Sequence, residues 1–179
     1  RDKGEWEILV DGIIFDSGDR NQYTGEGDLK IKRMYSAKTG ANATPNMPGL
    51  WIEMPPKFAK ITIQNCIAMN CAPNTMSGAF NVKAMAGNKV YIRNNLAVNN
   101  TGCGISCLTA WRSDKDRPQF FVENNTVLFT WKYDGMSSWS GRGLYVEPGV
   151  PVVAKNNVFA FSDFAGVANL NGKDFTNLT

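Results

Sequence analysis

Six side chains with useful chemistry occur at matching places in short strands that begin near a glycine. They are Trp51, Glu53, Asn81, Lys83, Tyr145 and Glu147. The apolar residues expected to face the interior of these strands are Ile52, Val82, Leu108 and Val146. Because side chains alternate along a strand, the six then face outward together with Cys107 and Thr109, and Lys83 lies one strand, about 4.8 Å, from Glu53. Carboxylates, an amine and aromatic rings on one face can bind cations, transfer protons and stack on flat ligands.

Two polar segments add cationic and aromatic side chains. The turn at 111–118 holds Trp111, Arg112 and Arg117, and the loop at 131–142 holds Trp139. Arginine forks match carboxylates and indole faces stack on flat rings, so these residues have the chemistry to bind a ligand. An ordinary solvated loop is the alternative for the first segment. A contact with another protein and packing over the strands are the alternatives for the second.

Composition and spacing exclude several kinds of catalysis. The chain has no histidine, which rules out Ser-His-Asp and Cys-His mechanisms. No two aspartates pair on the outward face, which disfavours the paired carboxylates of a glycoside hydrolase. Glu53 and Lys83 also have a plain alternative, an ion pair on a solvated face. A disulfide between Cys71 and Cys103 stays open, because composition does not fix the redox compartment.

A repeated phrase must position these side chains. It consists of an apolar strand and an asparagine bend, and it returns at Asn65, Asn94, Asn124 and Asn156. The intervals are 29, 30 and 32 residues, which is the range of a solenoid repeat. Asparagine suits a sharp bend because it tolerates the left-handed backbone conformation.

Each repeat contains three short strands and no helical periodicity, which predicts an all-β coil of about five to six turns with parallel sheets. The residue after each bend is expected to form an Asn ladder through Asn95, Asn125 and Asn157, with Cys66 in the same column. The stretches at 9–15 and 29–35 are interpreted as two degenerate coils with Gly12 and Met34 at their bends.

The phrases at 90–95, 121–125 and 153–157 resemble the right-handed parallel β-helix repeats of the pectate-lyase-like superfamily. The resemblance spans roughly residues 49–170 and implies a right-handed parallel β-helix. In that superfamily the outer face of one sheet and the turn after it bind polysaccharide. Some members are lyases that remove the C5 proton of a uronic acid with Lys or Arg, often with a calcium ion.

The resemblance therefore implies a set of roles for this chain, although no complete catalytic motif matches. Lys83 and Arg112 would be catalytic, and Ca²⁺ would be held by Glu53 and Glu147. The residues that would bind substrate are Trp51, Asn81, Trp111, Arg117, Trp139 and Tyr145.

The chain of 179 residues is expected to be a single β-helix domain, with a polar tail at 171–179. Its net charge of +3 is too small for a nucleic-acid footprint, and no run of about 18 apolar residues predicts a membrane span. A parallel β-helix normally covers its end strands, so we expect either a piece of a longer β-helix or a second chain that caps it.

Two classes of function stay open. The first is an extracellular, cell-surface or periplasmic protein that acts on acidic polysaccharide, as a lyase that works by β-elimination. The second is a non-catalytic β-helix for carbohydrate binding, adhesion or surface assembly. Resemblance of fold does not decide between them.

Overall fold

The computed structural model describes residues 6–16, 24–32, 38–39, 49–71, 78–110, 113, 115–132 and 140–169. Within these ranges the regular structure consists of strands, and nothing there forms a helix long and apolar enough to cross a membrane. The strands belong to two sheets, one of ten strands and one of six, which we call sheet A and sheet B.

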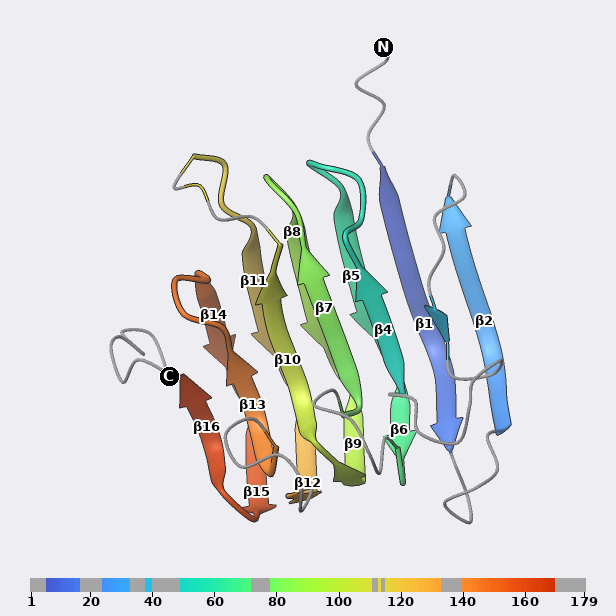
Figure 1. Ribbon diagram of the computed structural model, residues 1–179. Coiled ribbons are helices and arrows are strands. Elements are labelled where there is room, and N and C mark those ends of the chain that lie inside the picture. The colour runs from blue at the N-terminus through green and yellow to red at the C-terminus, as the bar shows by residue number, and fades with distance from the viewer. Residues whose placement is uncertain are drawn as a thin grey trace.

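In sheet B neighbouring strands follow the order of the sequence, whereas sheet A contains two series, β5-β8-β11-β14 and β6-β9-β12-β15, that both begin at β1 (Figure 1). Sheet A contains β1 (Glu7–Asp16), β2 (Thr24–Lys32), β5 (Lys60–Gln64), β6 (Ile67–Met69), β8 (Lys89–Arg93), β9 (Leu96–Thr101), β11 (Gln119–Glu123), β12 (Thr126–Trp131), β14 (Val152–Lys155) and β15 (Val158–Ser162). Sheet B contains β3 (Lys38–Thr39), β4 (Leu50–Glu53), β7 (Phe80–Ala84), β10 (Cys103–Thr109), β13 (Arg142–Val146) and β16 (Ala165–Asn169).

The chain winds as a coil, which confirms the prediction of a right-handed parallel β-helix. Each full turn takes one strand from sheet B and two from sheet A, as in β4, β5 and β6. The corresponding strands of successive turns pair in parallel, with Leu50 beside Phe80 and Ile61 beside Val90. Short repeats that bury a face only against their neighbours give a solenoid of this kind.

The start of the chain confirms one expectation and corrects another. β1 pairs with both β5 and β6, and Gly12 takes the bend opposite Asn65 with a φ of 68°. The stretch at 29–35 is not a second coil, because residues 29–32 belong to β2, which runs antiparallel to β1. Met34 lies outside the described residues. Alternating apolar residues are common to parallel and antiparallel strands, so the pattern could not show the direction. β2 instead covers the outer edge of β1.

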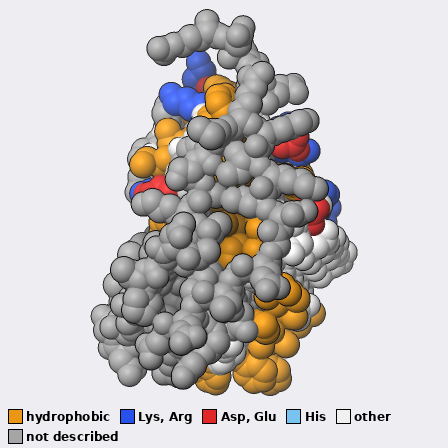
Figure 2. Space-filling view, turned by 90° about the vertical axis from the view of Figure 1, so that its right-hand side faces the viewer, with side chains coloured by type: hydrophobic (Ala, Val, Ile, Leu, Met, Phe, Trp, Pro, Cys, Tyr) orange, Lys and Arg blue, Asp and Glu red, His pale blue; other side chains and the backbone are white. Residues whose placement is uncertain are grey.

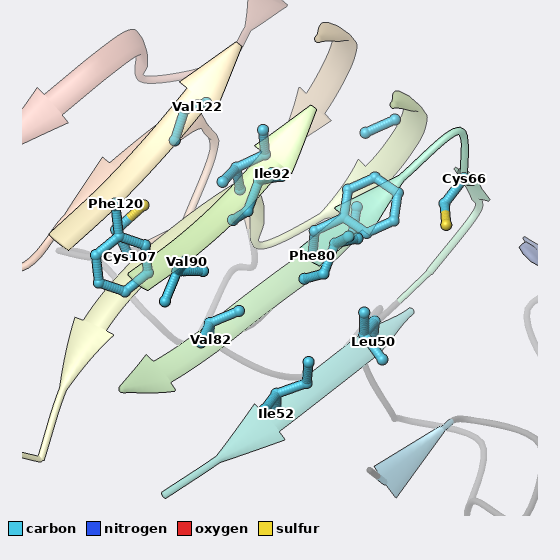
Figure 3. Close-up of a cluster of buried hydrophobic side chains, with 14 of the residues drawn as sticks. Leu50, Ile52, Cys66, Phe80, Val82, Val90, Ile92, Cys107, Phe120 and Val122 are labelled. Carbon is cyan, nitrogen blue, oxygen red and sulfur yellow. The ribbon is translucent and has the colours of Figure 1, made fainter. Parts of the chain in front are cut away.

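Stacked apolar columns fill the interior of the coil. Figure 3 shows Leu50 and Phe80 from sheet B among side chains such as Val90 and Phe120 from sheet A. All four are 0% exposed. Phe120 lies beside Val90 on one side and Val152 on the other, so each turn buries its apolar face against the next. Burial of one such side chain contributes roughly 1.5–3 kcal/mol.

The bends of sheet A form a row along the helix axis, which we call the first bend row. Its members have φ between 53° and 68° and are Gly12, Asn65, Asn94, Asn124 and Asn156. Asparagine occupies this left-handed region at low cost, whereas most other residues lose about 1–2 kcal/mol there. The side chain of the next residue points inward in each turn, as the burial of Asn95 and Asn125 shows.

Hydrogen bonds join these inward amides from turn to turn. Asn125 Oδ1 accepts from Asn95 N at 3.1 Å and from Asn95 Nδ2 at 2.9 Å. Asn157 Oδ1 accepts in the same way from Asn125 N at 2.9 Å and Asn125 Nδ2 at 3.0 Å. Each amide also donates to a backbone carbonyl, as Asn125 does to Ile92 O at 2.8 Å. These bonds satisfy polar groups that burial would otherwise leave without partners.

Five residues further along, a second bend row repeats the left-handed backbone with different side chains. Its members are Asn70, Asn99, Phe129 and Phe161, with φ of 55° or 56°. The inward residues that follow them are Cys71, Asn100, Thr130 and Ser162. Figure 2 views the side of the molecule at β1 and β2 and shows hydrophobic side chains gathered at its lower end.

Candidate functional site

The outer face of sheet B carries most of the residues expected to bind a ligand. Trp51 pairs with Asn81 and Glu53 with Lys83, as the sequence predicted. In the next strand, however, Ser106 lies beside Asn81 and Leu108 beside Lys83, whereas Cys107 lies beside the buried Val82. The outward placement of Cys107 and Thr109 and the inward placement of Leu108 were therefore wrong.

A shift of one residue in the glycine column explains this error. Gly49, Gly104, Gly143 and Gly166 occupy equivalent places, but in the turn that starts with β7 that place belongs to Ala79, and Gly78 comes one residue earlier. A Cβ at Gly104 would lie 2.2 Å from Val127 Cγ1, so a close approach requires the glycine. Because side chains alternate, a shift of one residue reverses every face assignment in the strand.

Three side chains form a small polar cluster at one end of this face. Lys83 Nζ donates to Glu53 Oε1 at 3.2 Å, and Trp51 Nε1 donates to Glu53 Oε2 at 3.3 Å. The Lys83 and Glu53 side chains are each 36% exposed, so a ligand can reach both. An ion pair with this exposure contributes about 0–1 kcal/mol and can exchange partners readily.

Two of the expected ligand-binding residues are buried. Asn81 is 1% exposed, and its Nδ2 donates to Leu50 O at 3.2 Å and Gly78 O at 3.3 Å. Tyr145 is 2% exposed, and burial, helped by the nearby Glu147 carboxylate, raises the pKa of its hydroxyl above the usual range. Tyr145 is therefore neutral, and neither side chain is exposed to a ligand although both belong to the outward row of the sheet.

Arg142 is a cation that the sequence interpretation missed. It is 4% exposed, and its guanidinium lies 5.4 Å from the Tyr145 ring centre and 4.7 Å from that of Phe164. Within the described residues nothing accepts a hydrogen bond from its Nε or Nη1. A cation between two rings is stabilised by their electron-rich faces. The aromatic residue three positions after Arg142 was the available signal in the sequence.

The two carboxylates assigned to calcium do not form one site. Glu53 belongs to the first of four neighbouring strands and Glu147 follows the fourth, so they lie about 14 Å apart. Calcium takes oxygen ligands at 2.3–2.6 Å. Glu147 Oε2 accepts instead from Thr109 N at 2.7 Å. Among the described residues no three Cys, Asp or Glu side chains gather as metal ligands.

The remaining candidates lie beyond sheet B. Arg117 is exposed in the turn before β11, and its Nη1 donates to Gly149 O at 2.9 Å. Trp111, Arg112 and Trp139 lie outside the described residues. The structure therefore brings together Trp51, Glu53 and Lys83, whereas Arg117 lies apart from them against Gly149, in the turn that follows β13.

The four cysteines are buried and none of them forms a disulfide, so no covalent bond joins Cys71 to Cys103. Burial raises the pKa of Cys103 to about 12, with Ser106 and Arg142 acting in the opposite direction. Burial also raises the pKa of Cys107. Thiols with raised pKa values hold little thiolate near neutral pH, so neither is an activated nucleophile.

Comparison with known protein families agrees with this architecture. The model of the family described as right handed beta helix region matches residues 10–179. No curated protein and no solved structure matches the chain. With almost its whole length covered, the chain belongs to the right-handed β-helix family.

Proposed function

We propose that this β-helix binds an acidic polysaccharide along the outer face of sheet B, outside the cell or at its surface. The observation that carries the proposal is the cluster of Trp51, Glu53 and Lys83. It offers an aromatic ring and a half-exposed ammonium group on adjacent strands. A uronic acid presents both partners that such a pair recognises, a carboxylate and an apolar ring face.

The strand stacking gives the ligand its direction. Beyond Trp51 its outward row is buried as far as Tyr145, but the second outward row is partly exposed and repeats about every 4.8 Å along the axis, so a linear polymer can contact successive strands there. This row consists of Glu53, Lys83, Leu108 and Glu147. Arg117 is a further exposed cation, in the turn before β11, and its Nη1 donates to Gly149 O. The Glu53 carboxylate weakens the attraction for an anion but is held by Lys83 and Trp51, and a bound carboxylate can share the same ammonium group.

The test is a titration with oligogalacturonate. We expect Lys83→Ala to weaken binding about tenfold and Lys83→Arg to retain most of it, since a charged contact typically supplies 1–3 kcal/mol. Lys155→Ala, an exposed lysine on sheet A, is the matched control and should leave binding unchanged. Binding by the wild type should also weaken with added salt. Equal affinities of Lys83→Ala and the wild type would refute the placement on sheet B.

A lyase is the second candidate, favoured by an amine that is half-exposed on the same face. In β-elimination a base takes the C5 proton, C4 and C5 form a double bond, and the C4–O bond breaks as its oxygen takes a proton from water. Lys83 donates to Glu53, so it would have to lose a proton before it could act as this base. Absorbance of the unsaturated product tests the idea. If pectate, alginate and glycosaminoglycan all give no such product, with or without Ca²⁺, the lyase candidate is removed and binding is the function that remains.

A further inference from the structure

One outer face of the coil carries apolar side chains on all of its strands. It is the outward side of β6, β9, β12 and β15 together with the second half of β1, and we call it the apolar face. Ala68, Ala97 and Val127 in these strands are buried, so the residues on either side of them point outward. The outward residues form one row of Ile14, Ile67, Leu96, Thr126 and Val158 and a second of Met69, Val98, Leu128 and Ala160.

None of these nine residues carries a charge. The other arm of sheet A is built by the same repeat, yet each of its four strands has a charged outward residue. These residues are Lys60, Lys89, Arg93, Glu123 and Lys155. A strand with one solvated side alternates apolar and polar residues, whereas a strand covered on both sides is a nearly continuous apolar run. The runs at 96–98 and 158–161 are continuous, so these strands have the sequence of strands that are covered on both sides.

Solvent nevertheless reaches the apolar face. Ile14 is 41% exposed at one end of it, and Phe129 and Trp131 are 38% and 40% exposed along the second bend row. Val98 and Leu128 in the middle are half-buried among their neighbours from adjacent turns. Figure 2 shows hydrophobic side chains gathered at the lower end of the molecule, where Figure 1 places β6, β9, β12 and β15. Contiguous apolar surface of this kind marks a contact with another molecule.

A second β-helix of the same period matches the shape of this face. Flat sheets pack face to face about 10 Å apart, with the side chains of one sheet between those of the other. The rows of the apolar face repeat about every 4.8 Å along the axis, and an identical chain offers rows of the same spacing. A contact with two-fold symmetry requires a surface that is complementary to itself. A flat face without charge meets this requirement, because no like charges are brought together.

The charges at the borders of the face argue against a lipid surface as the partner. Surfaces that bind membranes carry Lys and Arg next to their apolar residues. At the border along the first bend row, Glu123 lies between Arg93 and Lys155 in the paired strands. At the other border, Asp163 Oδ2 accepts from Lys132 N at 2.8 Å. Both borders therefore mix the two signs and offer no cationic rim to anionic lipids.

The size of the face sets the strength of the contact. Its five strands span roughly 24 Å along the axis, and the residues from Thr126 to Trp131 span about 17 Å across it. The footprint is then about 400 Å², whereas each partner of a standard protein interface buries about 800 Å². We therefore expect a weak, reversible contact with a dissociation constant in the micromolar range.

We propose that two copies of this chain associate through their apolar faces, sheet against sheet. The contact removes apolar side chains of both copies from water, which is the main driving force of protein association. β9 is the third of the five strands, so a two-fold axis through the centre of the face brings the two copies of Val98 close together. The contact leaves the outer face of sheet B free and does not depend on the function proposed for it.

Sedimentation velocity of the full chain from about 1 to about 200 μM tests the proposal. We expect the wild type to form a dimer in this range. Val98→Lys places a charge in the apolar contact and should raise the dissociation constant at least tenfold. Val153→Lys is the matched control, because Val153 is a half-buried outward valine on the other arm of sheet A. It should associate like the wild type. If Val98→Lys does not fold, Val98→Thr should weaken association in the same direction.

Complementary charges test the two-fold arrangement itself. Val98→Lys and Val98→Glu should each be monomeric, and an equimolar mixture of them should recover the dimer because opposite charges then meet at the centre. Two monomeric variants that do not associate when mixed would overturn this arrangement. A wild type that stays monomeric over the whole range would overturn the proposal, as would a dimer that Val98→Lys leaves unchanged.

Vesicles distinguish a different partner of the same face. If a monomeric wild type sediments with vesicles of phosphatidylcholine and phosphatidylglycerol and Val98→Lys does not, the face binds lipid and the dimer is wrong. The two proposals for this protein fail separately. Val98→Lys should bind oligogalacturonate like the wild type, whereas Lys83→Ala should leave the dimer unchanged.

Discussion

The two bend rows solve the same geometric problem with different side chains. Both reverse the chain with left-handed residues that recur once per turn. The first row is asparagine from Asn65 onward, and the inward residue after each bend is an amide in the last three turns. The second row changes from Asn99 to Phe129, and its inward residue changes from Asn100 to Thr130. The backbone fixes the bend, whereas the side chains decide whether neighbouring turns are joined by buried amides or by stacked exposed rings.

The two rows differ in the hydrogen bonds that their inward side chains make. The side chain of Asn125 makes four hydrogen bonds with its neighbours in adjacent turns. In the second row Asn100 makes two, to Cys71 N and Ala68 O, and within the described residues nothing pairs with Thr130 Oγ1 or Ser162 Oγ. A stack of rings outside replaces the chain of amides inside. In the turns of Phe129 and Phe161, the second row therefore has fewer internal hydrogen bonds and a larger exposed aromatic surface than the first row.

The largest expected effect comes from removing the central amide of the first row. Asn125→Ala leaves Asn95 N and Ile92 O buried without these partners, and each such loss costs about 1–3 kcal/mol. We expect the free energy of unfolding to fall by roughly 3–5 kcal/mol, measured by urea denaturation. Asn100→Ala should cost about half as much. Equal losses at the two sites would contradict the difference drawn between the rows.

Exchanging the bend residues between rows should give a smaller, asymmetric effect. Asn94→Phe places a phenyl side chain in the left-handed region without a ring to stack on, and should cost about 1–2 kcal/mol. Phe129→Asn relieves that strain but loses the stacking with Phe161, worth about 0.5–1.5 kcal/mol, so its net effect should be close to zero. Thermal unfolding of both variants checks this. A large loss for Phe129→Asn would mean that the stack is a structural element.

Sequence alone predicted the coil because its period and its bends are local properties. The asparagine at each first bend and the alternation before it define both the repeat and the strand type. The second row was also present in the sequence, since Asn70, Asn99, Phe129 and Phe161 each follow a first-row asparagine by five residues. The second row was not predicted, because phenylalanine rarely adopts the left-handed backbone and its spacing alone does not indicate a bend.

The site was harder to predict than the fold for a different reason. Face assignment depends on register, and Cys107 and Leu108 are both acceptable core residues, so composition could not show which one points inward. The burial of Asn81 and Tyr145 and the contact of Arg142 with the Phe164 ring depend on residues distant in sequence. The direction of β2 is likewise decided by its pairing with β1, which no local pattern records.

The buried hydroxyl of Thr130 gives a prediction of opposite sign, a substitution that raises the free energy of unfolding. Thr130 is 0% exposed and its Oγ1 has no hydrogen-bond partner among the described residues, so the nearly isosteric Thr130→Val should stabilise the fold by about 1 kcal/mol. Thr109 is the matched control, because its hydroxyl donates to Ala84 O at 3.3 Å. Thr109→Val should destabilise the fold by a similar amount. If both variants lose stability in urea denaturation, Thr130 has a partner that the present contacts do not include.

The smallest effect concerns the thiol that begins the first inward row. Cys66 Sγ lies 3.7 Å from Val10 O, the place where an amide in this row would donate, and Cys66 N donates to Asn95 Oδ1. Burial above all, with the Asp11 carboxylate, raises the pKa of this thiol above its ordinary value of 9.0. Well below pH 9 the thiol is neutral in both the folded and the unfolded chain, so it adds no pH dependence there. Above pH 9 the unfolded chain loses the proton first, and the free energy of unfolding falls as pH rises.

Cys66→Asn removes this titration while keeping a polar group at the head of the row. Near neutral pH its stability should lie within about 1 kcal/mol of the wild type. From pH 9 upward the variant should become progressively more stable than the wild type, by at most about 1.4 kcal/mol for each pH unit. Cys103 and Cys107 are present in both proteins, so their contributions cancel in the difference. Urea denaturation of the two proteins from pH 7 to pH 10 measures the difference in their free energies of unfolding. A difference that does not change with pH would show that the Cys66 thiol has the same pKa in the folded and the unfolded chain.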